Sequence, residues 1–411
     1  MNSSFADRLL VGLFCAALVL PTSLRVAGWT APFSAEVEKR PPAAWPELEI
    51  RRRGPLRVPR TADLEAFPRR FEAWLNDRLG LRRELLQLYA WARLHGVVPA
   101  AAAAIGDGGA ARCPVLIGLD GWLFYTGEGS LESFRRTRPF NTAQLEAWRR
   151  VLRERRDWLA RRGIAYLVVV APDKQTIYPE QVPASQTRIG PHSRLDQLLA
   201  ALDGERDAEL LDLRPALEAA KRERPVYYRT DSHWNAYGAH VGERAMVERL
   251  QRHVPTLRPT TLADYEVTEG PTPGGGDLAV MLDAPTPPVD RRIELRPRTP
   301  RRAVVEPTPI ALDDGSYVRG VAAQCAGATS GTAVVLHDSF FEEPRSAFNE
   351  HWRRVVYAQT YEFPATLIER ERPQAVVQEI VERALMNLVP KNPPLPEAPA
   401  AWAEGTTAER R

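Results

Sequence analysis

A serine and an Asp-x-His pair are the residues of this 411-residue chain whose types and spacing could do covalent chemistry. Ser339 follows a run of branched apolar residues, and Asp231 and His233 stand more than 100 positions earlier. A serine hydroxyl becomes a good nucleophile when a histidine takes its proton and a carboxylate orients that histidine. The pattern therefore predicts that Ser339 is a nucleophile, His233 its base and Asp231 the orienting acid.

Each of these residues also has a purely structural explanation. Ser339 and Asp231 could cap helices, and His233 could be a hydrogen-bonded packing histidine. His337 precedes Ser339 by two positions and would share its face of a strand, so it is a second candidate base. A helix that begins just after Ser339 would direct free backbone N–H groups toward a developing oxyanion.

Alternating strand and helix signals must position these groups. Ile164–Val170 is a fully apolar run, as expected of a buried parallel strand, and Ala333–His337 (AVVLH) is predicted to be a second buried strand. The other elements expected are strands at 209–213, 355–358 and 375–379 and helices at 141–163, 194–202 and 235–253. This alternation predicts an α/β fold with a mostly parallel sheet flanked by helices. Ligand sites in such sheets lie at the carboxyl ends of the strands, where Ser339 stands.

The organisation of the chain follows from shifts in its composition. Arg8 precedes the uncharged run Leu9–Leu20, which is shorter than the roughly 20 residues of a spanning helix and suits either a signal peptide or, with extension, an uncleaved anchor. The parts predicted are an export segment at 1–29, a linker and helical stalk at 30–111, a folded domain at 112–388 with an irregular proline-rich insertion at 255–332, and a disordered tail at 389–411.

Composition and cysteine content exclude several classes of function. A net charge of +3 provides no field that would attract nucleic acid, and clusters such as Arg51–Arg53 are expected as solvated surface. No CxxC motif or Cys/His cluster is present, so we predict no structural zinc, and no nucleotide-binding motif is visible. Cys113 and Cys325 are the two cysteines outside the N-terminal apolar run, and they could pair in an oxidising compartment.

Several segments resemble the SGNH-hydrolase-like O-acetyltransferases of alginate and related exopolysaccharide systems, the AlgJ/AlgX family. The segments, in the family's order, are Gly118–Tyr125, Pro172–Lys174 with Tyr178–Glu180, Thr230–Asn235 followed by Gly238–Ala239, and His337–Phe340. In that family the Asp-x-His pair precedes the serine block, which permutes the usual order of SGNH hydrolases, and this chain shares the permutation. His337 departs from the family, because it replaces the glycine of the usual Gly-Asp-Ser.

The resemblance implies an SGNH-like (flavodoxin-like) domain that transfers acetyl groups through an acyl-serine, with Ser339, His233 and Asp231 in the catalytic roles. It implies no cofactor and no metal. The partners would be a polysaccharide acceptor and a membrane-bound acyltransferase that supplies acetyl groups. The location would be the cell envelope, at the periplasmic face of the inner membrane, either anchored there by the N-terminal segment or secreted to the periplasm.

Supporting residues and rival functions remain open at this point. Alignment with SGNH hydrolases puts Arg383 near the oxyanion position. Lys174 is either a substrate contact or a surface salt bridge, and Tyr125, like Trp122, either stacks on sugar or packs in the core. An acetyl-esterase with the same three residues would use water as the acceptor. A polysaccharide-binding scaffold would need no catalysis, so that Ser339→Ala would leave polymer acetylation intact.

Overall fold

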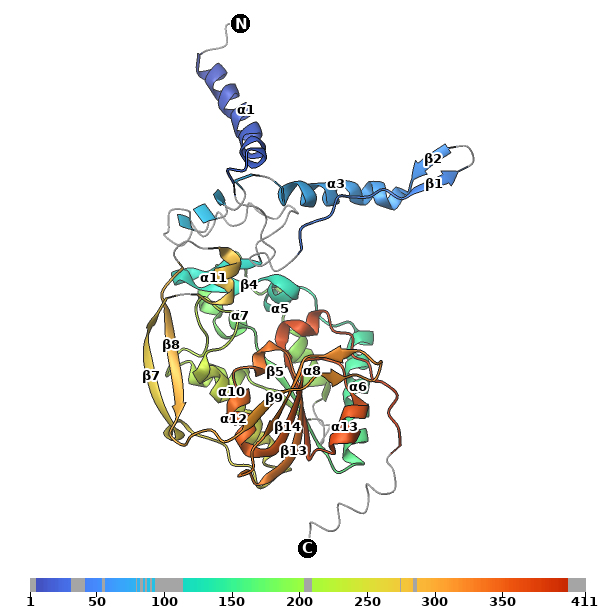
Figure 1. Ribbon diagram of the computed structural model, residues 1–411, viewed down its shortest axis with the longest axis vertical. Helices are drawn as coiled ribbons and strands as arrows, with labels where there is room; N and C mark the ends of the chain where they lie inside the picture. The colour runs from blue at the N-terminus through green and yellow to red at the C-terminus, as the bar shows by residue number, and fades with distance from the viewer. Residues whose placement is uncertain are drawn as a thin grey trace.

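The computed structural model describes residues 5–30, 41–53, 56–78, parts of 80–92, 114–202, 209–273, 275–283 and 287–397. A seven-stranded sheet lies at the centre of the domain (Figure 1). Its parallel strands, in spatial order, are β6 (Glu209–Asp212), β5 (Ala165–Ala171), β15 (Ala375–Val381), β13 (Ser330–Leu336) and β14 (Trp352–Ala358). The antiparallel strands β12 (Gly320–Gln324) and β9 (Val304–Pro307) complete one edge. The predicted mostly parallel α/β sheet is confirmed.

Both faces of this sheet are buried, which explains why its central strands have continuous apolar sequences. Alternate residues of β5 enter two different cores: Leu167 and Val169 on one face, Val168 and Val170 on the other. The helices that cover the second face are α6 (Thr142–Ala160), α8 (Arg194–Leu202) and α13 (Ala365–Glu371). Those that cover the first face are α9 (Arg214–Ala220), α10 (Ala236–Leu250) and α12 (Arg345–Phe348).

Local signals in the sequence fix where two of these helices, α6 and α10, begin. Asn141 caps α6, since its side chain accepts a hydrogen bond from the Gln144 amide and the Gln144 side chain accepts one from the Asn141 amide. Asn235 caps α10 by accepting from the Gly238 amide at 2.9 Å. The second cap matters for function, because it fixes the point at which the loop with Asp231 and His233 enters a helix.

The stretch 255–332 is not irregular, contrary to the sequence prediction. It contains the antiparallel hairpin β7 (Tyr265–Thr272) and β8 (Asp290–Pro297), the helix α11 (Asp277–Leu282), a small pair β10 (Ile310–Ala311) and β11 (Tyr317–Val318), and the edge strands β9 and β12. Figure 1 shows β7 and β8 running beside the body of the domain. In β8 the apolar residues Ile293 and Leu295 alternate with charged residues, because β8 packs against α10 on one face and faces water on the other.

The N-terminal part contains α1 (Phe5–Val26), the hairpin β1 (Ile50–Arg53) and β2 (Leu56–Pro59), and α3 (Thr61–Asn76). Among the described residues, no helix combines the length and apolarity needed to cross a bilayer. Cys325 is a buried free thiol whose Sγ lies 3.7 Å from Glu350 Oε2, and Cys113 lies outside the described residues.

Part of the tail predicted to be disordered, 389–411, has a defined place in the structure. Residues up to 397 lie along α6 as a strap, and residues 398–411 lie outside the described part. Buried polar groups of α6 hold this strap: Arg155 Nη2 donates to the Lys391 carbonyl at 2.7 Å, and Trp158 Nε1 donates to the Pro396 carbonyl at 2.8 Å. The composition of the strap, rich in proline, prevents helix and strand but not docking.

Candidate active site

Ser339 stands at the carboxyl end of β13, near the middle of the sheet. β13 ends at Leu336, and Ser339 opens a three-residue 3-10 turn. Asp338 caps this turn, because its Oδ1 accepts a hydrogen bond of 2.8 Å from the Phe340 amide. The longer helix predicted here does not form, since Pro344 follows and disfavours helical backbone at the residue before it. The Ser339 amide begins the turn and has no partner within it.

The loop that carries Asp231 and His233 joins α9 to α10 and has only one isolated bridge, between Tyr227 and Trp234. His233 Nε2 lies 2.9 Å from Ser339 Oγ, and His233 Nδ1 lies 2.8 Å from Asp231 Oδ1. Trp234 Nε1 donates to the Phe340 carbonyl at 3.1 Å, which ties this loop to the turn of the serine. The structure therefore brings the three predicted residues together in a continuous hydrogen-bonded series.

The electrostatics of the pair suit a base oriented by an acid. Burial opposes the ionised form of Asp231, yet the hydrogen bond and charge of His233 hold the pKa of Asp231 at about 2. Burial also opposes the charged form of His233, but the hydrogen bond and charge of Asp231 and the charge of Asp277 outweigh it, so its pKa is raised. With the proton on Nδ1, the Nε2 lone pair faces Ser339 Oγ. Such an arrangement can remove the hydroxyl proton as the oxygen attacks an acyl carbon.

Lys174 is neither a surface salt bridge nor a free donor for substrate. It follows β5, its side chain is 2% exposed, and its Nζ donates to the carbonyls of Tyr228, Arg229 and Asp231 at 3.1, 3.0 and 2.6 Å. An ammonium group has three N–H bonds, so these acceptors use all of them. Sequence reasoning placed Lys174 correctly at a strand end and missed that it points toward the loop that carries Asp231 and His233.

Arg383 lies beside the site, at the end of β15. Its Nη1 donates to Asp173 Oδ1 at 2.8 Å and its Nε to Glu128 Oε2 at 3.0 Å. Its guanidinium carbon lies 5.2 Å from the ring centroid of Tyr125 and 5.6 Å from that of Phe340, the neighbour of Ser339. The role of Arg383 at the oxyanion position stays a prediction.

The two aromatic candidates have different environments. Trp122 is buried, and its ring centroid lies 4.3 Å from that of Tyr178, so it belongs to the core. Tyr125 is half-buried at the end of β4 (Leu123–Tyr125), and burial raises the pKa of its hydroxyl. Sugar stacking remains a prediction for Tyr125 alone.

His337 faces the core and not the serine. Its Nδ1 lies 2.6 Å from the Asp338 carbonyl oxygen, and its ring packs against Phe341 and Tyr357. Burial lowers the pKa of His337 to about 4. The second-base prediction fails because the strand ends at Leu336, so the alternation of side chains that would align His337 with Ser339 does not continue.

Two acids that the sequence reasoning missed, Asp277 and Asp290, hold the loop that carries Asp231 and His233 from the side of the hairpin. Asp277 accepts from the Ser232 amide and hydroxyl at 2.7 and 2.6 Å, and its own amide donates to Asp231 Oδ2 at 3.1 Å. Asp290 accepts from the Arg229 amide at 3.0 Å and from the amide and hydroxyl of Thr230 at 2.9 and 2.8 Å. Both acids belong to the stretch read as an irregular insertion.

One sequence signal for this contact was available in the glycine run before Asp277. A Cβ on Gly276 would lie 2.5 Å from the carbonyl carbon and oxygen of Thr230, so only glycine allows this approach. The run indicated a close backbone contact without revealing its partner.

A layer of buried acids lies beneath the serine turn. Glu379 Oε2 accepts from the Asp338 amide at 3.1 Å, and Asp338 Oδ2 accepts from the Tyr361 hydroxyl and the Val381 amide, each at 2.7 Å. Burial first, and the charge of Asp338 second, raise the pKa of Glu379 well above its usual range. These bonds fix Asp338, and through it the turn that presents Ser339.

Within the described residues, Asp231, His233 and Asp277 are the group whose ligand atoms approach metal-like spacing, all within 4.8 Å of one another. Their carboxylates already accept hydrogen bonds from His233, Ser232 and the Asp277 amide. The set therefore fits an acid–base function without a bound cation.

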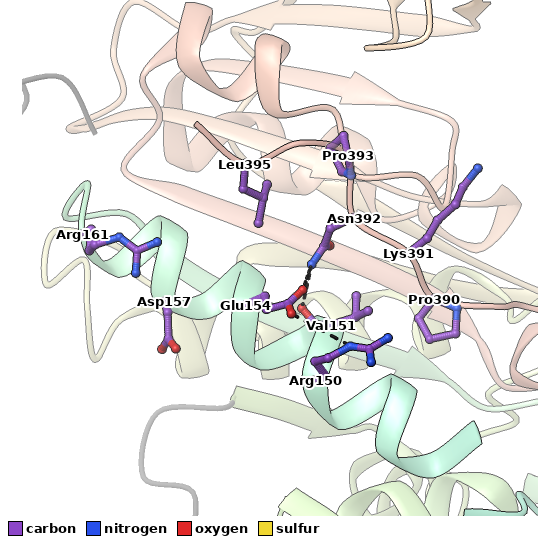
Figure 2. Close-up of a pocket in the computed structure, with 10 residues that line it drawn as sticks. All are labelled: Arg150, Val151, Glu154, Asp157, Arg161, Pro390, Lys391, Asn392, Pro393 and Leu395. Carbon is purple, nitrogen blue, oxygen red and sulfur yellow. Dashed lines mark hydrogen bonds and ion pairs between the residues drawn. The ribbon is translucent and has the colours of Figure 1, made fainter. Parts of the chain in front are cut away.

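A pocket of about 670 Å³ lies elsewhere, between α6 and the strap. Figure 2 shows Glu154 and Asn392 pointing toward each other across it, joined by a hydrogen bond of 2.8 Å. No member of the Ser339–His233–Asp231 series lines this pocket.

The sheet, the serine at a strand end and the Asp-x-His loop before α10 define an SGNH-hydrolase-like domain. Residues 115–315 match the family described as "SGNH hydrolase-like domain, acetyltransferase AlgX"; the matched range includes Asp231 and His233 and ends before Ser339. Over this range the chain is similar to the AlgJ/AlgX-like family.

Named relatives include the probable alginate O-acetylases AlgJ of Pseudomonas aeruginosa and Azotobacter vinelandii. They are 31% identical over 208 residues and 32% identical over 139 residues. These matches cover 50% and 32% of this chain, and 49% and 32% of the relatives. The chain thus spans half or less of the length of the relatives it matches.

Solved structures that match part of this chain include the O-acetyltransferase domain of Pseudomonas putida AlgJ, with 22% identity and a TM-score of 0.43, covering 71% of this chain and 98% of that one. Another is Bacillus cereus PatB1, with 12% identity and a TM-score of 0.48, covering 68% of this chain and 99% of that one.

Proposed function

We propose that this chain is an O-acetyltransferase that moves acetyl groups through an acyl-serine onto hydroxyls of an exported polysaccharide. The observation that carries the proposal is the series Ser339 Oγ–His233–Asp231, with contacts of 2.9 and 2.8 Å. These distances lie in the range that proton transfer requires. The relatives named as alginate O-acetylases support acetyl as the group transferred.

In the proposed reaction Ser339 Oγ attacks the carbonyl carbon of an acetyl donor while His233 Nε2 takes the hydroxyl proton. The Ser339 amide donates to the tetrahedral oxyanion, and collapse expels the leaving group, which takes the proton from His233. A sugar hydroxyl then loses its proton to His233 and attacks the acetyl-serine. Collapse releases the sugar acetate and returns the proton to Ser339. Asp231 holds the histidine tautomer throughout.

The proposed setting rests on the apolar run Leu9–Leu20 and on the resemblance to the AlgJ/AlgX family. The folded domain at 112–388 is the catalytic unit, and the N-terminal segment at 1–29 directs it to the cell envelope. The acceptor is a polysaccharide in the periplasm. The donor is a membrane-bound acyltransferase that delivers acetyl groups to Ser339.

The test combines the purified chain with 4-nitrophenyl acetate and an oligosaccharide, with mass spectrometry of both protein and sugar. We expect acetylation at Ser339 and then on the sugar, with both lost in Ser339→Ala. Ser346→Ala, at an exposed serine on α12, is the matched control and should act as wild type. Acetate release without sugar acetylation would indicate an esterase, and an unchanged Ser339→Ala would refute the catalytic assignment.

A further inference from the structure

The loop of the base has little regular structure of its own, although catalysis by His233 needs a fixed geometry. Between Tyr227 and Trp234 the chain forms neither helix nor strand, and the main-chain carbonyls of Tyr228, Arg229 and Asp231 converge on one point. Converging carbonyl oxygens repel one another unless a donor or a cation lies between them. Lys174 Nζ occupies that point.

The anchor for this cation is rigid. Lys174 follows β5, a strand paired on both sides in the sheet, and its Nζ lies 5.7 Å and 5.4 Å from the ring centroids of the buried Trp122 and Phe124. Burial lowers the pKa of the ammonium to about 7, while the charges of Asp231, Asp277 and Asp290 favour its protonated form. Three carbonyl acceptors favour that form as well, because a neutral amine would turn a lone pair toward one of them.

We propose that Lys174 is a positioning residue for the reaction: by binding the three carbonyls it fixes the backbone of Asp231, and with it the alignment of His233 toward Ser339. Lys174 touches no reacting atom and acts through the loop alone. The effect of Lys174 on the reaction rests on the proposed function. Its effect on the alignment of His233 toward Ser339 does not.

The test compares Lys174→Met, which keeps the length of the side chain without charge or N–H, with the matched control Lys221→Met. Lys221 also donates to a main-chain carbonyl, that of Ile177, but pairs with Glu180 away from the triad. The first readout is the rate at which a sulfonyl fluoride labels Ser339. The second is the low-field proton resonance of His233 Nδ1–H in the full chain, assigned with His233→Gln.

We expect Lys174→Met to label about a hundred-fold more slowly, as for a group displaced by about 1 Å, and to lose the resonance while its far-UV circular dichroism is retained. Lys221→Met should match wild type in both. Wild-type labelling and resonance in Lys174→Met would overturn the proposal. Should Lys174→Met fail to fold, Lys174→Gln, whose amide keeps two N–H donors, is judged by the same readouts. A wild-type chain that does not label would refute the proposed function, while the resonance would still test Lys174.

Discussion

At the scale of single residues, His233 has two ring nitrogens with different partners. Nδ1 faces a carboxylate whose pKa is about 2, and Nε2 faces the hydroxyl of Ser339. Only the neutral ring can accept the serine proton, so the fraction of active protein falls as pH falls through the pKa of His233. In the proposed mechanism Asp231 therefore both orients His233 and sets the pH at which His233 accepts the proton.

Replacing Asp231 by asparagine should separate these two effects. The amide lacks the charge that raises the pKa of His233, so the acid limb of the pH–rate profile should move to lower pH. The plateau rate should fall by about 10³–10⁴-fold, because the amide no longer selects the Nδ1–H tautomer. Both quantities come from the rate of Ser339 acylation between pH 4 and 9. An acid limb that stays in place in Asp231→Asn would contradict the assignment of the limb to His233.

Protonation of His337 should change the free energy of unfolding rather than the rate of Ser339 acylation. Its pKa is about 4 in the folded chain because it is buried, whereas an unfolded histidine titrates near about 6.5. The unfolded state therefore binds more protons between these values, and stability falls as pH falls through this window, by about 3 kcal/mol in total. Urea unfolding at pH 7 and pH 4.5 should show a smaller loss in His337→Gln than in wild type. His192→Gln, at an exposed histidine, is the control and should lose as much stability as wild type.

At the scale of elements, the sequence predicts the central strands and the long helices well. The apolar run at 164–170 corresponds to β5, and the helix at 194–202 coincides with α8. Buried parallel strands have continuous apolar sequences, which single-chain patterns reveal. The hairpin of β7 and β8 was not predicted, because its strands face water on one side and are joined through α11. The contact of Asp277 with Asp231 spans 46 positions, and no local pattern encodes such a distance.

The segment between β7 and β8 approaches the loop that carries Asp231 and His233. Substitutions at the adjacent glycines Gly276 and Gly275 should therefore have different effects. In Gly276→Ala the new Cβ would meet the Thr230 main chain at 2.5 Å, and backbone cannot move as a flexible side chain does. We expect Asp277 to be displaced from Ser232 and Asp231, and Ser339 acylation to slow by at least about ten-fold. Gly275→Ala is the matched control, since nothing lies within 4 Å of its new Cβ. Equal rates in the two variants would show that the segment does not position the base.

At the scale of the whole molecule, the site forms where separate parts of the chain meet at the carboxyl ends of the central strands. Ser339, Lys174 and Arg383 follow β13, β5 and β15, which are neighbours in the sheet. Sequence alone could place each residue at the end of a strand. Because the carboxyl ends of parallel strands lie on the same side of a sheet, the three residues are then expected near one another. Sequence could not orient their side chains, because orientation depends on partners such as Tyr228 and Asp173 that come from other elements.

The strap at 390–397 bonds to Arg155, Trp158 and Arg162 and not to Ser339, His233 or Asp231, so stability and activity should separate there. A chain that ends at Leu388 loses acceptors for two α6 side chains and for Arg162, just beyond the end of α6. These acceptors are Asn392 Oδ1 and the Lys391 carbonyl for Arg155, and the Pro396 carbonyl for Trp158 and Arg162. These donors are buried, and removing their partners should cost about 2–4 kcal/mol, reduced from the full sum by water that enters in their place.

The melting temperature of this truncated chain should fall by several degrees, while Ser339 acylation at 20 °C stays at the wild-type rate because α6 packs on the sheet face and contributes nothing to the triad. A chain that ends at Glu397 is the control: it keeps every described strap contact and should melt as the full chain does. Differential scanning fluorimetry with an acylation assay on the same samples measures both. If the truncated chain is still folded at 20 °C but its acylation rate has fallen, the strap supports the carboxyl end of the sheet, where Ser339 lies, as well as α6.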